Sequence, residues 1–339
     1  WAASPASLKS LNVAGRIGSP ASGGSASSTR PPGNTYYPAM NATLSFRRTI
    51  RISKGLPSRR TTTVDAGRGG VILVTSKFYY AFNLCKSVAV IERKDADGIR
   101  TIKLAHGKVS ALDIELGEAF VKEMEAAHDP SVKAVILTGS GSSFSAGVDL
   151  FRVLKDGPDY GRRFLPVLDN LLRAALTLPK PMIAAINGHA IAGGCILAST
   201  CDHRIMTEGN GRIGIPELIV GVPFPALPLQ IMSARVADGP LRELVFTGRT
   251  VLIDEAKTLG LIDEKCPSGM LMDRAMEVAE RMTTIPAGAF ALTKEAFYTP
   301  ILERTKQLAD MNARVVDAWL QPHTYDTIRA YLEKTVGKK

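Results

Sequence analysis

The pattern of apolar and polar residues becomes regular at about residue 88 and from there predicts strands that alternate with helices. Segments 88–93 and 99–104 have the composition of strands, and the sequence between them, Asp95-Ala96-Asp97-Gly98, favours a turn. We therefore expect the folded part of the chain to begin with a β-hairpin.

Two continuous apolar runs, at 133–138 and 181–186, predict strands that are covered on both faces of a sheet. A further strand is expected at 203–206. Helices are expected at 114–127 (capped by Asp113), 159–178, 193–201, 224–234, 240–247, 254–259, 269–283 and over most of the chain beyond Pro286. This order is typical of an α/β core followed by a helical C-terminal region.

The first 70 residues are rich in Ser, Gly, Pro, Thr and Arg and are expected to be disordered. Such an acid-poor leader resembles an organellar transit peptide, and an extension without function is the alternative. We divide the chain into a basic leader (1–87), a core (88–285) and a helical region (286–339). A genuine transit peptide predicts the mitochondrial matrix, and a spurious leader predicts the cytoplasm.

The net charge of +10 belongs to the leader, because residues 1–90 hold twelve Lys/Arg and one acidic residue, leaving 30 basic and 31 acidic residues. A near-neutral core argues against a nucleic-acid-binding face. The chain has no uninterrupted apolar run long enough to predict a membrane span. A binding protein whose basic leader contacts RNA or an anionic membrane remains an alternative of a different class.

Several common cofactor motifs are missing. The four cysteines form no C-x-x-C pair and the five histidines lack metal-ligand spacing, so we expect no bound metal. Gly139-Ser140-Gly141 follows a strand, but Phe144 stands where a dinucleotide loop needs its third glycine. Neither a P-loop nor a G-x-S-x-G elbow is present, and we expect no cofactor. Cys195 and Cys201 are expected to be small buried residues.

Two glycine turns and one carboxylate are the candidates for chemistry. Residues 145–149 (SAGVD) and 192–194 (AGG) place glycines where a helix begins, so their backbone N–H groups can hold an oxygen that gains negative charge. Glu217 lies among aliphatic residues. Burial there would raise its pKa toward that of a general base, whereas the alternative is that it only opens a helix.

Four motifs carry a resemblance to a known family: S-x-F-S-A-G-x-D at 142–149, N-G-x-A-x-A-G-G-C at 187–195, C-D-x-R-I at 201–205 and G-I-P-E-L-x-V-G at 214–221. Ser110-Ala111-Leu112-Asp113 and Leu292-Thr293-Lys294 also match its recurrent sequences. In this order and spacing, the chain resembles the crotonase superfamily, the enoyl-CoA hydratase/isomerase family, over about residues 88–337.

The resemblance implies a spiral core of ββα units, a helical region that builds a homotrimer or hexamer, and an acyl-CoA thioester substrate. Coenzyme A is then part of the substrate rather than a cofactor. In the family, two backbone N–H groups polarise the thioester carbonyl, and they correspond to Val148 and Gly193. Substrate contacts are expected at the neighbouring positions, namely Ser145, Ala146, Gly147, Asp149, Gly194 and Ile196.

One position departs from the family's hydratases, which use two glutamates. One of these matches Glu217, but the other follows the Gly-Gly-Cys triplet, where this chain has Ile196. A single base suffices to move a proton from C2 of a 3-enoyl-CoA to C4. We therefore expect an enoyl-CoA isomerase of fatty-acid β-oxidation, with Glu217 as its catalytic residue.

Three alternatives to the isomerase remain within the family. A hydratase would have to recruit another acid, such as Glu243 or Asp149, and acyl-CoA hydrolases and decarboxylases share the fold. Pro223-Phe224-Pro225 replaces glycines found in hydratases. It is expected either to shape the acyl pocket or to stiffen the entry to a helix.

Overall fold

The computed structural model describes residues 90–336, so the leader and its expected disorder lie outside the described residues. The strands are β1 Ile91–Ala96, β2 Ile99–Leu104, β3 Ala134–Thr138, β4 Ser143–Ser145, β5 Met182–Ile186, β6 His189–Ile191, β7 His203–Thr207, β8 Ile213–Gly214, β9 Thr250–Val251 and β10 Glu264–Cys266. The helices are α2 Ile114–Ala126, α3 Leu150–Thr177, α4 Gly193–Thr200, α5 Glu217–Val220, α6 Ala226–Ser233, α7 Asp238–Thr247, α8 Ile253–Thr258, α9 Leu271–Thr283, α10 Ala287–Gln307, α11 Ala309–Trp319 and α12 Pro322–Val336.

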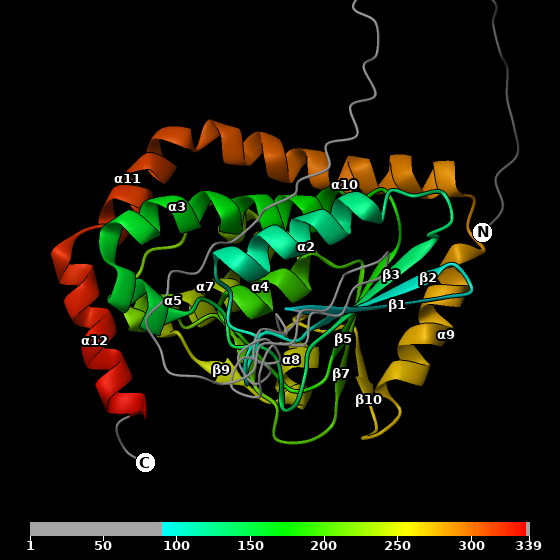
Figure 1. Ribbon diagram of the computed structural model, residues 1–339, viewed down its shortest axis with the longest axis horizontal. Coiled ribbons are helices and arrows are strands. Elements are labelled where there is room, and N and C mark those ends of the chain that lie inside the picture. The colour runs from blue at the N-terminus through cyan, green and yellow to red at the C-terminus, as the bar shows by residue number, and fades with distance from the viewer. Residues whose placement is uncertain (1–89, 337–339) are drawn as a thin grey trace, which may run out of the picture. The chain divides into compact units, whose positions relative to one another are not determined.

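The main sheet has the strand order β1-β2-β3-β5-β7-β10 and is parallel except for the β1–β2 hairpin. Alternate residues of β3 enter two different hydrophobic clusters: Val135 and Leu137 belong to one, Ala134 and Ile136 to the other. Figure 1 shows α9 on one side of this sheet and α2, α3 and α4 on the opposite side. The prediction of strands covered on both faces is therefore confirmed.

Three consecutive ββα units follow the hairpin and α2. In each unit, the first strand (β3, β5, β7) joins the main sheet, the second (β4, β6, β8) joins a smaller sheet with the order β4-β6-β8-β9, and a helix (α3, α4, α5) follows. The second strands were not predicted, because segments of two or three residues are too short to show a period of two. The repeat brings the starts of α3, α4 and α5 to the side of the small sheet.

Two predicted elements begin three or more residues from the expected position, and the others begin within two residues of it. Strand β1 begins at Ile91 rather than 88, and the turn is limited to Asp97 and Gly98, which adopt φ values of 52° and 80°. Helix α3 begins at Leu150 rather than 159, and Asp149 caps it. Gly157, with φ 72°, kinks the helix just before Pro158, and these two residues hid its first turns from the pattern.

The C-terminal helices close one side of the core, as expected for the region beyond Pro286. Helix α10 packs along α3 and α6, α11 packs on the same two helices, and α12 reaches α3 and α5 (Figure 1). Among residues 90–336, no helix is long and apolar enough to cross a bilayer. The trimer or hexamer stays a prediction.

Candidate active site

The two glycine turns meet in space, although about 45 residues separate them in the sequence. A Cβ added to Gly147 (φ 80°) would lie 2.6 Å from the Ile191 carbonyl oxygen and 3.0 Å from the Gly193 nitrogen. A Cβ added to Gly193 would lie 3.9 Å from the Val148 nitrogen. Glycine is therefore required at position 147, whereas at position 193 the tight contact of an added Cβ would be with the Leu112 side chain (2.9 Å).

The amides of Val148 and Gly193 are both free to bind an oxygen. Gly193 is the first residue of α4, so its N–H has no acceptor within the helix. Among the described residues, no acceptor is found for the Val148 N–H, although both neighbouring residues exchange hydrogen bonds with Leu112. Ala192 caps α4 with φ 52° and ψ −125°, a conformation that L residues rarely adopt and that aims the first turn of the helix.

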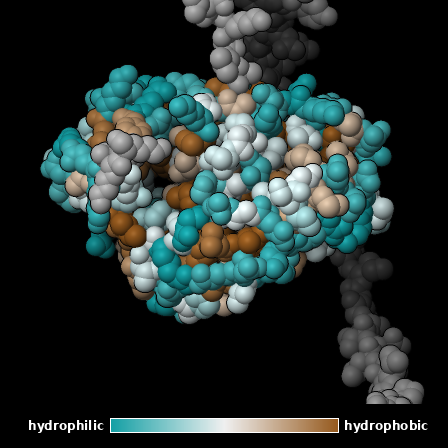
Figure 2. All heavy atoms as spheres, turned by 90° about the horizontal axis from the view of Figure 1, so that it is seen from below, coloured by the Kyte–Doolittle hydropathy of each residue, from teal (hydrophilic) through white to brown (hydrophobic). Residues whose placement is uncertain are grey.

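A mostly apolar cavity of about 280 Å³ opens beside these amides. On the face seen in Figure 2, hydrophobic side chains gather at a hollow among mostly hydrophilic ones. The lining includes six of the predicted site residues, Ala146, Val148, Asp149, Gly193, Ile196 and Glu217. The sequence therefore identified one contiguous site.

Three other predicted contact residues, Ser145, Gly147 and Gly194, do not line this cavity. The Ser145 hydroxyl donates to the Ser110 carbonyl oxygen (2.7 Å) and accepts from the Gly147 N–H (3.2 Å). A Cβ on Gly194 would lie 2.3 Å from the Ser145 carbonyl oxygen. These three residues lie behind the residues that line the cavity, and their contacts hold the two glycine turns against each other.

Glu217 opens helix α5 and is also buried, so both interpretations of this residue hold. The residue is 7% exposed, and its Oε2 has no hydrogen-bond partner among the described residues. Burial raises the pKa of Glu217 to about 8, against a small lowering by its own backbone N–H. A carboxylate with this raised pKa is a stronger base than an ordinary carboxylate, and it lines a mostly apolar cavity.

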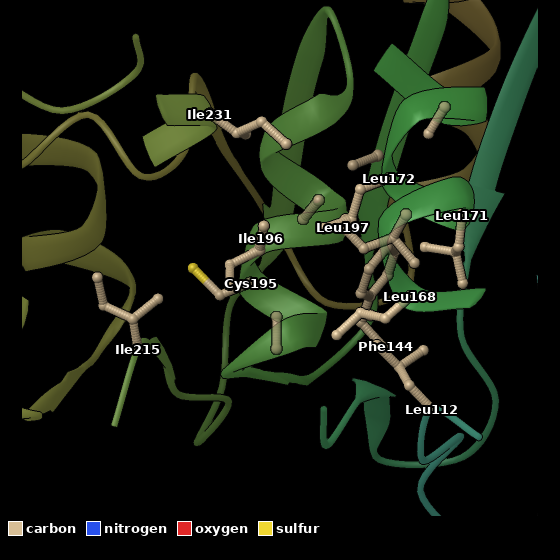
Figure 3. Packing of buried hydrophobic residues seen from close by; sticks show 14 of the residues in the cluster. Leu112, Phe144, Leu168, Leu171, Leu172, Cys195, Ile196, Leu197, Ile215 and Ile231 are labelled. Atoms are coloured by element: carbon tan, nitrogen blue, oxygen red, sulfur yellow. The ribbon is translucent and has the colours of Figure 1, made fainter. Parts of the chain in front are cut away.

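The position that holds the second glutamate in the family's hydratases is occupied here by an aliphatic side chain, Ile196, which lines the cavity. Ile196 is 4% exposed, on α4. In Figure 3, Cys195 points toward the segment of Ile215, whereas Leu197 points toward Leu168 of α3. The predicted burial of Cys195 is confirmed, and burial raises the pKa of its thiol to about 12.

The two acids named as substitutes for a second glutamate are both engaged elsewhere. Asp149 lines the cavity, but its carboxylate accepts the Arg152 N–H (3.0 Å) and caps α3. Glu243 is outside the cavity lining and binds Arg249 through both oxygens, which lowers the pKa of Glu243. Two acids line this cavity, Asp149 and Glu217. Among the described residues, the Glu217 carboxylate contacts only its own backbone N–H, so Glu217 is the one that is available for chemistry.

Two further motifs of the resemblance serve the framework. The Asp202 carboxylate accepts from the buried Lys294 ammonium (2.7 Å) and from the Met182 N–H (2.9 Å), which ties α10 to β5. Arg204 forms a bidentate pair with Asp263 (2.8 Å for each bond). In each pair the basic side chain is buried and the acidic one is partly exposed, and the pair ties together elements that are distant in sequence.

The sequence did not identify the part of the cavity that the C-terminal helices supply. Trp319, Tyr331, Leu332 and Thr335 line it from α11 and α12. No local motif marks them, since they lie more than a hundred residues beyond Glu217. Phe224 lines the cavity and Pro225 both lines it and caps α6, so both interpretations of this segment hold.

The spiral of ββα units and the paired amides beside an apolar cavity define an α/β protein of the crotonase fold. The model of the family described as enoyl-CoA hydratase/isomerase matches residues 94–338, and the chain belongs to this family. Its recognition from the motifs is thus confirmed.

Individual relatives carry names for two different reactions. A putative enoyl-CoA hydratase of Thermus thermophilus is 37% identical, over 61% of this chain and 82% of the relative. The mitochondrial enoyl-CoA delta isomerase 1 of Rattus norvegicus is 26% identical, over 74% of this chain and 88% of the relative. The crystal structure of the human mitochondrial delta3-delta2-enoyl-CoA isomerase shares the fold with a TM-score of 0.70 and 23% identity, covering 74% of this chain and 99% of that one.

Proposed function

We propose that this enzyme is an enoyl-CoA isomerase that converts a 3-enoyl-CoA into the 2-enoyl-CoA. The observation that carries the proposal is the single available carboxylate, Glu217, in a cavity where Ile196 occupies the second acid position. Addition of water needs a second acid–base group that holds the water molecule and exchanges protons with it, which isoleucine cannot do. Moving a double bond needs only one group that takes a proton and returns it.

In the proposed reaction, the Glu217 carboxylate removes a proton from C2 of the substrate. The electron pair of the broken C–H bond is delocalised toward the thioester oxygen, which gives a dienolate. The protonated Glu217 then returns the proton to C4, and the remaining double bond lies between C2 and C3. The reaction consumes no water and requires no redox cofactor.

The amides of Val148 and Gly193 are the proposed donors to the dienolate oxygen. Preorganised donors of this kind contribute about 3 kcal/mol each to the stability of a transition state. A base whose pKa is near 8 suits both half-reactions, because it accepts a proton from a weak carbon acid and still returns it at neutral pH. The positioned base adds roughly two to four orders of magnitude in rate.

The test gives the purified full chain 3-hexenoyl-CoA and follows the conjugated 2-enoyl thioester, with water addition to crotonyl-CoA measured in parallel. We expect isomerisation to exceed hydration by at least about a hundredfold, the lower bound of what one missing acid–base group costs. The name of the 37% identical relative makes hydration the second candidate. Faster hydration than isomerisation would favour it.

A further inference from the structure

A second cavity adjoins the site and has no part in the proposed reaction. Its volume is about 490 Å³, and it lies between α3, α6, α10 and α11. Five residues line both this space and the 280 Å³ cavity: Leu168, Leu172, Pro225, Pro228 and Trp319. These residues form a partition between two hollows that would otherwise be one.

Trp319 is the largest member of the partition and the only one that the C-terminal helices supply. It ends α11 and is 5% exposed. Its indole Nε1–H donates to the Pro223 carbonyl oxygen (2.9 Å), just before the α6 segment that contributes Pro225 and Pro228. The ring is therefore held between α3 and α6 in one orientation.

The space on the catalytic side of this ring is small. Small-molecule sites commonly have volumes of about 300–1,000 Å³, and the catalytic cavity, at about 280 Å³, is just below that range. The residues that it shares with the second cavity are hydrophobic, as a wall facing an acyl tail requires. An acyl chain that grows from the thioester toward α3 meets Leu168, Leu172 and Trp319.

We propose that Trp319 ends the acyl pocket and limits the length of the acyl chain, so that the enzyme prefers short-chain acyl-CoA thioesters. This proposal rests on the proposed function for the reaction but concerns only the tail of the substrate. When the indole is removed, the second cavity becomes the continuation of the pocket. Each further methylene that is then buried tightens binding about fourfold.

The test measures dissociation constants of butanoyl-, octanoyl- and dodecanoyl-CoA for the wild type and W319A. These saturated thioesters contain no double bond to move, so binding reports the tail alone. We expect dodecanoyl-CoA to bind W319A at least about tenfold more tightly than the wild type, which is the effect of fewer than two methylenes. Butanoyl-CoA should bind both proteins within about twofold.

Two control variants separate volume from other effects. W319F keeps an aromatic ring but loses the hydrogen bond to Pro223, and it should keep the chain-length preference of the wild type. Ala313 lines only the second cavity and is exposed on α11. A313W alone should therefore change nothing, whereas the W319A/A313W double variant should lose the gain for dodecanoyl-CoA, because the new ring fills the opened space.

The proposal is overturned if W319A, folded by circular dichroism, binds the three thioesters in the same ratios as the wild type. Where W319A is too unstable to purify, W319L removes the ring with a smaller loss of packing and carries the same expectation. The two hypotheses fail separately. Absent turnover of 3-hexenoyl-CoA contradicts the isomerase, whereas an unchanged binding series contradicts the role of Trp319.

Discussion

Glu217→Gln tests the buried base through the stability of the protein as well as through its activity. The folded protein holds the pKa of Glu217 at about 8, against an ordinary value of 4.5. At 1.36 kcal/mol for each pH unit, this difference corresponds to roughly 5 kcal/mol of destabilisation once the group is fully ionised. The residue is 7% exposed, so solvent screens little of this effect.

The sign follows from proton binding. Below pH 4.5 the carboxyl is protonated in the folded and the unfolded chain, and the wild type has its full stability. Between pH 4.5 and about 8 the folded state binds more protons than the unfolded state, so the stability of the wild type falls as the pH rises. The glutamine side chain of the variant does not titrate, so the variant should gain up to roughly 5 kcal/mol over the wild type across this window.

The assay is urea unfolding of both proteins at several pH values from 4 to about 9, reported as the difference in free energy of unfolding. Every other group titrates in both proteins, so the difference isolates Glu217. Glu243→Gln is the matched control, because Glu243 is exposed and Arg249 lowers its pKa. The difference in free energy of unfolding between Glu243→Gln and the wild type should have the opposite sign. A difference between Glu217→Gln and the wild type that does not change with pH would refute the reasoning.

Activity should follow the same titration. The kcat/KM of the wild type for a 3-enoyl-CoA is expected to rise with pH and level off above about 8, as Glu217 ionises. The Glu217→Gln variant should be slower by about two to four orders of magnitude and should lose this pH dependence. Full activity of the variant would exclude Glu217 as the base.

Substitutions at three further positions have defined outcomes. Ile196→Glu restores a second acid and should raise water addition to crotonyl-CoA at least about tenfold, whereas Ile196→Gln, which introduces a side chain of the same size without the acid, should not. Gly147→Ala brings a Cβ within 3.0 Å of the Gly193 nitrogen and should lower kcat about 10²–10³-fold with a smaller change in KM. Lys294→Met leaves Asp202 unpaired and should cost about 3–5 kcal/mol in urea unfolding, while kcat at low temperature stays within about twofold.

The sequence predicted the parts of the site that depend on local backbone geometry. Glycine at 147 is needed where two turns approach closely, and a turn of this kind is visible in the residue types themselves. The aliphatic neighbours of Glu217 made its burial one of two interpretations, and both hold in the structure. Ser145 was expected to contact substrate because it is adjacent in sequence, but alternate residues of a strand point to opposite sides.

The parts that the sequence did not predict depend on contacts between distant segments. Trp319 lies about a hundred residues beyond Glu217, and no period or motif relates the two positions. The first turns of α3 were missed because Gly157 and Pro158 interrupt its pattern, although the helix continues around a kink. A side chain that completes a cavity from another helix can be identified only when the packing of that helix is known.

Ile196 lines the same cavity as Glu217, and its aliphatic side chain bears both on the missing second acid and on the raised pKa of Glu217. An acid in place of Ile196 would bring water into the cavity, whereas an aliphatic side chain excludes it. Exclusion of water is also the main reason why Glu217 holds its proton at neutral pH. A proton shuttle needs a group that is a good base before the transfer and a good acid after it. In the proposed reaction, the isoleucine that leaves the site without a second acid therefore also prepares Glu217 to return the proton it has taken.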